Sequence, residues 1–241
     1  MDTRKTARIA GWLFIVTFVA GIPPALFLYT RVLDNARYVL GAGADTRIAL
    51  GAFLEMILIV ANIGTAVALF PILKRQNEGL ALGYVTARLV ECGFIAVGIL
   101  SLLAVVTLRQ DVGGVAGASS LVPVGRSLVA IHDWAFLLGP GWVVGVGNGL
   151  ILGYLMYRSG LVPRGMAMLG LVGGSLIIAS GTAVLFNVIE PGSALQGIAT
   201  VPEFFWELLL GIYLIVKGFR PSPLTTDAGA PVAAEPVLVP A

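Results

Sequence analysis

Six long apolar segments constrain the fold of this chain more than any other feature of its sequence. A bilayer core of about 30 Å needs roughly 20 apolar residues in an α-helix. Charged residues make up 12% of the chain, against about 25% in a typical soluble domain, which excludes a soluble globule. We therefore expect an all-α integral membrane protein, a six-transmembrane-helix bundle in a lipid bilayer. The segments run approximately from Ile9 to Leu28, Ile48 to Leu73, Leu80 to Leu108, Leu128 to Tyr157, Met166 to Val188 and Thr200 to Lys217.

Basic residues near the ends of the segments predict the orientation. One side carries Arg4, Lys5, Arg8, Lys74, Arg75, Arg158, Arg164, Lys217 and Arg220, and the other carries Arg31, Arg37, Arg47, Arg109 and Arg126. The excess on the first side predicts that both termini are cytoplasmic. We expect residues 1–220 to form the transmembrane domain and residues 221–241, rich in Pro and Ala, to form a disordered cytoplasmic tail. The net charge of +2 is too small to indicate nucleic-acid binding.

Several ionisable residues lie inside the apolar segments, where each costs about 2.5 kcal/mol or more and indicates a functional site. Glu55 and Asn62 are seven residues apart and share a helix face, as do Glu203 and Glu207 at a spacing of four. Arg88 and Glu91, three apart, are expected to form a structural ion pair. His132 and Asp133 lie near the start of the fourth segment.

The depths of these residues predict a polar cavity in the outer half of the bilayer. Glu55 and Glu207 have no cation at i±3 or i±4, so unless Arg88 reaches one of them, burial favours their protonated forms. We expect Glu207 to be the proton donor, with Glu55 or Asp133 across the cavity and His132 as a proton-sharing partner. In the alternative interpretation, Asp133 and Glu203 favour the positive ends of helix dipoles near interfacial water, and His132 makes an ordinary hydrogen bond there.

Aromatic and amide side chains accompany the acids and are candidates for binding an apolar substrate. Aromatic rings stabilise a carbocation formed by protonating an alkene. The alternative for the rings is a belt at the membrane interface. The candidate substrate-binding residues are Trp134, Phe136, Phe204, Trp206, Asn62 and Asn148.

The fourth segment contains a proline near its centre, in the sequence Gly139-Pro140-Gly141. Proline removes a backbone donor, so we expect this helix to be kinked there. Glycines then recur every four residues, at Gly141, Gly145, Gly149 and Gly153, and predict a smooth ridge for close helix contact.

Short motifs spread along the chain resemble a bacterial six-span group catalogued as domain of unknown function 4386. The motifs are Ala7-Arg8-Ile9-Ala10-Gly11, Glu55 with Ala61-Asn62, Leu69-Phe70-Pro71-Ile72-Leu73, Ala87-Arg88-Leu89-Val90-Glu91, Leu138-Gly139-Pro140, Tyr157-Arg158-Ser159-Gly160-Leu161-Val162-Pro163-Arg164, and Pro202-Glu203 with Lys217-Gly218-Phe219. The group is functionally uncharacterised. The resemblance implies a six-helix architecture in the cell membrane, the inner or plasma membrane of a bacterium, and no particular activity.

The sequence lacks the residues that several kinds of chemistry require. One His and one Cys cannot supply an ordinary zinc site, and there is no glycine-rich phosphate loop, so we expect neither a metal nor a cofactor. Three hypotheses follow. The first is an isomerase or cyclase, similar in design to small membrane terpene cyclases, that protonates a hydrophobic small molecule such as an isoprenoid or lipid. The others are a proton-coupled small-solute carrier, for which a homodimer is possible, and a non-catalytic scaffold subunit.

Overall fold

The computed structural model describes residues 2–35, 37–40, 45–112 and 118–225, which contain helices and no strand. Six helical stretches are long and apolar enough to cross a membrane, and they run Thr3–Leu33, Asp45–Leu73, Glu78–Asp111, Ser119–Ser159, Arg164–Leu185 and Ala194–Val216. The expected six-helix bundle is thereby confirmed.

Four of the six stretches are each a single α-helix, and three of these are α3 (Asp45–Leu73), α4 (Glu78–Val112) and α7 (Arg164–Leu185). The first stretch comprises α1 (Thr3–Pro23), the wider turn η1 (Pro24–Leu28) and the short α2 (Thr30–Leu33), followed by η2 (Tyr38–Leu40). The last is α8 (Ala194–Val216), whose N-cap Ser193 accepts a hydrogen bond from the Gln196 backbone N–H.

The fourth stretch is interrupted where Pro140 predicts a kink. After η3 (Ala118–Leu121) and α5 (Val122–Leu138), the chain enters two π-helical segments, η4 (Gly139–Val143) and η5 (Gly145–Leu152), and then α6 (Gly153–Ser159). Wider π turns are rare and often mark functional sites. They also rotate the side chains of η5 relative to those of a continuous α-helix.

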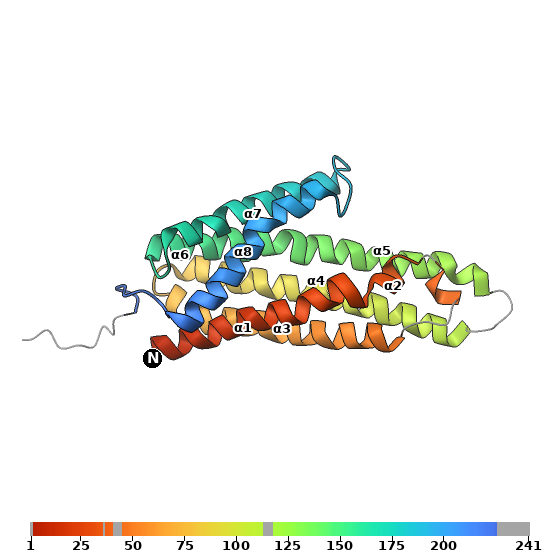
Figure 1. Cartoon of the computed structure of the whole chain (residues 1–241), viewed down its shortest axis with the longest axis horizontal. Helices are drawn as coiled ribbons and strands as arrows, with labels where there is room; N and C mark the ends of the chain where they lie inside the picture. Colours follow the sequence, from red (N-terminus) through yellow and green to blue (C-terminus); the bar gives the residue numbers. More distant parts are fainter. Residues whose placement is uncertain (1, 36, 41–44, 113–117, 226–241) are drawn as a thin grey trace, which may run out of the picture.

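Both ends of the transmembrane region lie at the same end of the bundle, as Figure 1 shows for the start of α1 and the end of α8. We call this the terminal end, and we call the opposite end, which holds α2 and the connection between α7 and α8, the loop end. Helix α1 packs against α3 and α8, α4 packs against α3 and α5, and α7 packs against α8 and η5. In Figure 1 the tip of the α7–α8 hairpin at the loop end stands apart from α1 and α5.

The largest apolar core lies at the terminal end and draws on all six spans. Its members include Phe14, Leu69, Tyr84, Leu155 and Leu210, all fully buried. The first residues of the C-terminal tail contact this end, since the Ser222 hydroxyl donates to the Ser159 carbonyl oxygen at 3.3 Å. The rest of the predicted disordered tail, residues 226–241, lies outside the described residues.

Candidate functional site

Helices α3 and α4 are joined at mid-length by a closed ring of three polar side chains. Arg88 donates from Nη1 to Glu91 Oε2 at 2.8 Å and from Nη2 to Asn62 Oδ1. Asn62 Nδ2 in turn donates to Glu91 Oε1 at 3.1 Å. All three side chains are buried, with exposures of 1% to 5%. Each residue therefore bonds to the other two, which satisfies most of their polar atoms and fixes the register of the two helices.

Helix α8 brings two further carboxyl groups, Glu203 and Glu207, close to this ring. Asn148, in η5, donates from Nδ2 to Glu207 Oε1, and the Arg88 guanidinium is close enough to interact electrostatically with Glu207. Trp206 is fully buried and donates from its indole nitrogen to the Asn148 carbonyl oxygen at 3.0 Å. The π-helical segment of the fourth span is thus tied to α8 through both the side chain and the backbone of one residue.

Glu203, one turn before Glu207, lies in a notch between two glycines. A Cβ atom at Gly149 would stand 3.0 Å from Glu203 Oε2, and one at Gly173 would stand 2.8 Å from it. Glu203 is 3% exposed, and both of its carboxyl oxygens lack a hydrogen-bond partner in the described part of the chain. Asn148 Oδ1 is likewise buried and unpartnered there. Burying an unpaired carboxylate is costly, so these orphaned oxygens indicate a site that exchanges a proton or a cation.

We name Asn62, Arg88, Glu91, Asn148, Glu203 and Glu207 the central cluster. It places three carboxyl groups, Glu91, Glu203 and Glu207, within electrostatic range of one guanidinium. One cation balances one carboxylate, and full ionisation of all three would leave an uncompensated negative charge in a low-dielectric interior. Neutrality of the cluster therefore requires bound protons or a bound cation.

A second group of polar side chains lies nearer the loop end, and we name Tyr29, Glu55, His132 and Asp133 the loop-end cluster. The Tyr29 hydroxyl donates to Glu55 Oε2 at 2.7 Å, and the Tyr29 and His132 rings meet edge to face at 5.6 Å between centroids. His132 Nδ1 and Asp133 Oδ1 are 3.2 Å apart. Tyr29, Glu55 and His132 are buried, whereas the Asp133 side chain is 60% exposed.

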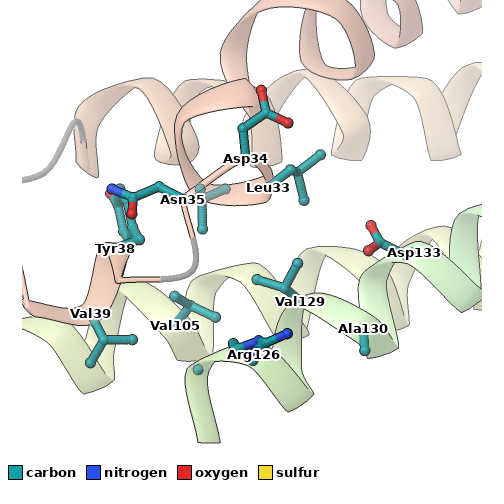
Figure 2. A pocket seen from close by; sticks show the side chains of 12 residues that line it. Leu33, Asp34, Asn35, Tyr38, Val39, Val105, Arg126, Val129, Ala130 and Asp133 are labelled. Carbon is teal, nitrogen blue, oxygen red and sulfur yellow. The ribbon is translucent and has the colours of Figure 1, made fainter. Parts of the chain in front are cut away.

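Asp133 faces a cavity of about 320 Å³ at the loop end. The cavity lies between the 32–39 segment, α4 and α5, with walls formed by apolar side chains such as Val105 and Val129. Figure 2 shows the Asp133 carboxylate pointing from α5 toward the segment that carries Leu33, whereas Asp34 points away from α5. His132 thus contacts Asp133, which lines the pocket, and the ring of Tyr29, whose hydroxyl bonds to the buried Glu55.

An apolar layer separates the two clusters. It belongs to a contact group of Ala52, Ile95 and Ile99, which are buried, with Leu58, Ile59 and Leu103 packed against them. Leu58 and Ile59 lie between Glu55 and Asn62, which are seven residues apart on α3, about 10.5 Å along the helix. Ile95 lies one turn beyond Glu91 on α4, before Gly98, which is level with His132.

The structure divides between two clusters the residues that the sequence analysis assigned to a single cavity. Glu207 lies with Arg88 and Asn148, while Glu55, His132 and Asp133 lie at the loop end. Glu207 belongs to the central cluster because Asn148 holds its carboxyl group there, within electrostatic range of Arg88. The candidate substrate-binding amides Asn62 and Asn148 both bond to carboxyl groups of the central cluster.

The candidate aromatic residues do not gather around one cavity. Trp134 and Phe136 are each 46% exposed, and Phe204 is 40% exposed with its ring against Phe18 at 5.2 Å. Trp206 is buried and binds a backbone carbonyl. The rings of Trp134, Phe136 and Phe204 therefore face outward from the bundle. The Trp206 ring packs between α8 and η5.

Tyr29 is the polar residue that sequence reasoning missed. A signal for it exists in Gly51, four residues before Glu55 on the same face of α3. A Cβ atom at Gly51 would stand 2.8 Å from the Tyr29 ring carbon that bears the hydroxyl, so glycine makes room for the ring. Gly51, one turn from the buried Glu55, thus indicates in the sequence that a large side chain packs against this face of α3.

The described residues contain no group of three or more His, Cys, Asp or Glu side chains placed to hold a metal ion. Cys92, the single cysteine, is buried.

Comparison with known proteins gives a family and no activity. No curated protein and no solved structure matches the chain. A family model described as a domain of unknown function (DUF4386) matches residues 9–218, which span all six membrane helices and both polar clusters. The chain therefore belongs to the DUF4386 family.

Proposed function

We propose that this protein is a proton-linked membrane carrier, in which the carboxyl groups of the central cluster exchange protons around Arg88. The observation that carries the proposal is the burial of Glu203, whose two carboxyl oxygens have no hydrogen-bond partner among the described residues. The single guanidinium of its cluster, that of Arg88, already forms an ion pair with Glu91. Intramembrane carboxyl groups of this kind are typical of proton relays in pumps and transporters.

The arrangement of the clusters supports a carrier more than an open channel. The loop-end cluster is in contact with a cavity, the central cluster is buried except for the partly exposed Glu207, and the apolar layer with Ile95 lies between them. A continuous water-filled path would dissipate the proton gradient, whereas an apolar barrier allows transfer only when the helices rearrange. Proton transfer at the pace of such a rearrangement is slower than flux through an open channel, and it can occur without a solute.

The enzyme hypothesis has less support from the geometry. An acid that protonates an isoprenoid has to face the cavity that holds the substrate. The cavity at the loop end is lined by Asp133 and the one near the start of α1 by Arg4 and Trp12, and Glu207 is in neither lining. The Trp134 and Phe204 rings are exposed, whereas Asn148, the hydrogen-bond partner of Glu207, is fully buried.

We further propose that the terminal end faces the cytoplasm of a bacterial cell, because the basic residues favour that side nine to five in the counts given above. The loop-end cavity then opens to the outside. Protons enter through Asp133 and His132 and reach Glu55, and after rearrangement of the apolar layer they reach the central cluster.

Proton flux into sealed vesicles tests the proposal. Purified protein is reconstituted with an internal pH indicator, and a potassium diffusion potential, negative inside, is imposed with valinomycin. We expect acidification by the parent protein to exceed that of Glu207→Gln by about tenfold or more, since the amide keeps the shape and removes the exchangeable proton. Glu190→Gln, at an exposed loop position, is the matched control and should retain the parent rate. Parent vesicles that acidify no faster than protein-free vesicles would contradict the proposal.

A further inference from the structure

The cavity at the loop end carries opposite charges on one face of α5. Arg126 and Asp133 both line it, and Val129 and Ala130 line it between them. The positions 126, 129, 130 and 133 recur at helical spacing and so share a face. Arg126 and Asp133 are seven residues apart, which is about 10.5 Å along the helix.

These charges are available to a ligand. Arg126 forms no side-chain hydrogen bond or ion pair with another residue of the described ranges. Asp133 contacts His132 through Oδ1 only. Asp34 also lines the cavity, but Figure 2 shows its carboxylate directed away from α5, which leaves Asp133 as the acid on the ligand side.

The wall between the charges is apolar, and the opposite wall combines valines with Asp34, Asn35 and Tyr38. Val129 points from α5 into the space seen in Figure 2, and Val32, Val39 and Val105 line the cavity from the 32–39 segment and α4. A ligand with charged groups at both ends and hydrocarbon between them therefore meets a matching surface at each part. The volume of about 320 Å³ is at the lower end of ligand pockets, which are about 300–1,000 Å³.

We propose that this cavity binds a small soluble zwitterion whose ammonium and carboxylate stand at opposite ends of an apolar segment. The ammonium pairs with Asp133, the carboxylate pairs with Arg126, and the hydrocarbon packs on Val129 and the opposite valines. That this zwitterion is the solute carried with the proton rests on the proposed function, whereas its binding does not.

The test uses three probes of matched length. Thermal unfolding of the purified protein in phosphatidylcholine nanodiscs is followed by tryptophan fluorescence with 6-aminohexanoate, hexylamine or hexanoate present. We expect 6-aminohexanoate to raise the unfolding midpoint and the two singly charged probes to have much less effect at equal concentration. Asp133→Asn and Arg126→Gln should each weaken the binding of 6-aminohexanoate about tenfold or more, because each removes a charge-assisted contact.

Matched controls exist at the same end of the bundle. Asp111→Asn and Arg47→Gln change exposed charges outside the cavity lining and should leave the binding unchanged. Equal stabilisation by hexylamine would overturn the proposal in favour of a cation site. No stabilisation by 6-aminohexanoate, or stabilisation by added phosphatidylethanolamine that Arg126→Gln cancels, would also overturn it. This assay involves no proton movement and the vesicle assay involves no solute, so the two proposals fail separately.

Discussion

The side-chain amide of Asn62 on α3 donates a hydrogen bond to Glu91 on α4, and the side-chain oxygen of Asn62 accepts one from Arg88. The amide therefore bridges the two members of an ion pair that a single helix turn already holds together. A buried pair without such a bridge has to satisfy its remaining lone pairs and protons elsewhere. The central cluster thus depends on α3 as much as on the helix that carries the charges.

Removing the cation should destabilise the bundle strongly. Arg88→Leu leaves Glu91 and Asn62 buried without their donor, and breaking a buried pair in this way costs about 3–5 kcal/mol. The double variant Arg88→Leu with Glu91→Leu should recover much of the loss, because no unpaired charge remains. Thermal unfolding of the detergent-solubilised protein measures both, with the exposed Arg47→Leu as control. An Arg88→Leu protein as stable as the parent would show that water reaches Arg88.

The glycine notch around Glu203 should not tolerate a side chain. In Gly173→Ala the new Cβ would stand 2.7 Å from the Glu203 Cα atom, so α7 and α8 have to separate, at a cost of about 1–3 kcal/mol. Gly165→Ala, on the same helix, meets nothing within 4 Å and is the matched control. Unfolding midpoints of the two variants should differ, with Gly165→Ala equal to or above the parent. Equal losses in both would point to a general intolerance of α7.

Glu203 should hold a proton at neutral pH, because no donor or cation pairs with either of its oxygens in the described structure. Infrared difference spectroscopy should detect the stretch of a protonated carboxyl group that is absent in Glu203→Gln. Glu78→Gln, at an exposed position in the first turn of α4, should leave that band in place. A spectrum in which Glu203→Gln removes only an ionised carboxylate band would require a bound cation at this position.

The apolar layer should limit the rate at which protons cross between the two clusters. Replacing the buried Ile95 with Ser should admit water between the clusters and raise the proton flux into vesicles several-fold above the parent rate. Ile95→Val keeps the layer apolar and should leave the flux at the parent level. If both variants conduct alike, the rate-limiting barrier lies elsewhere.

Labelling of introduced cysteines tests the orientation. Since Cys92 is the single cysteine and is buried, new cysteines at exposed positions report alone. Glu190→Cys at the loop end should react with a membrane-impermeant maleimide in intact cells, and Lys74→Cys at the terminal end should react only after permeabilisation. The reverse pattern would invert the topology.

The sequence predicted the bundle well because hydrophobic length is a property of each helix alone. The Arg88–Glu91 contact was also predictable, since the two residues lie three apart on one helix. The position of Glu203 was not. The apolar run indicates a start near Thr200, but α8 begins at Ala194, so Glu203 lies in the third turn and is buried among glycines. Helix ends depend on capping by residues such as Ser193 rather than on hydropathy.

The division of Glu207 and Glu55 between two clusters could not be predicted either, for a different reason. The face that a residue presents after Pro140 depends on the number of residues per turn, and the π-helical turns of η4 and η5 change that number. Asn148 therefore meets Glu207 through a geometry that an ideal α-helix does not provide. Glu55 remains with Tyr29 and His132 because η1 and α2 bring Tyr29 over Gly51.

The fourth span and α7 approach each other most closely where glycines face each other. A Cβ at Gly145 would stand 2.9 Å from the Gly174 carbonyl oxygen, and one at Gly174 would stand 2.6 Å from that of Gly145. Hydrogen bonds flank this contact, from the Trp142 indole to the Thr182 hydroxyl and between η5 and α8 through Asn148 and Trp206. We therefore expect η5 and the α7–α8 hairpin to move as one unit, because any shift of Glu207 relative to η5 first has to break its hydrogen bond with Asn148.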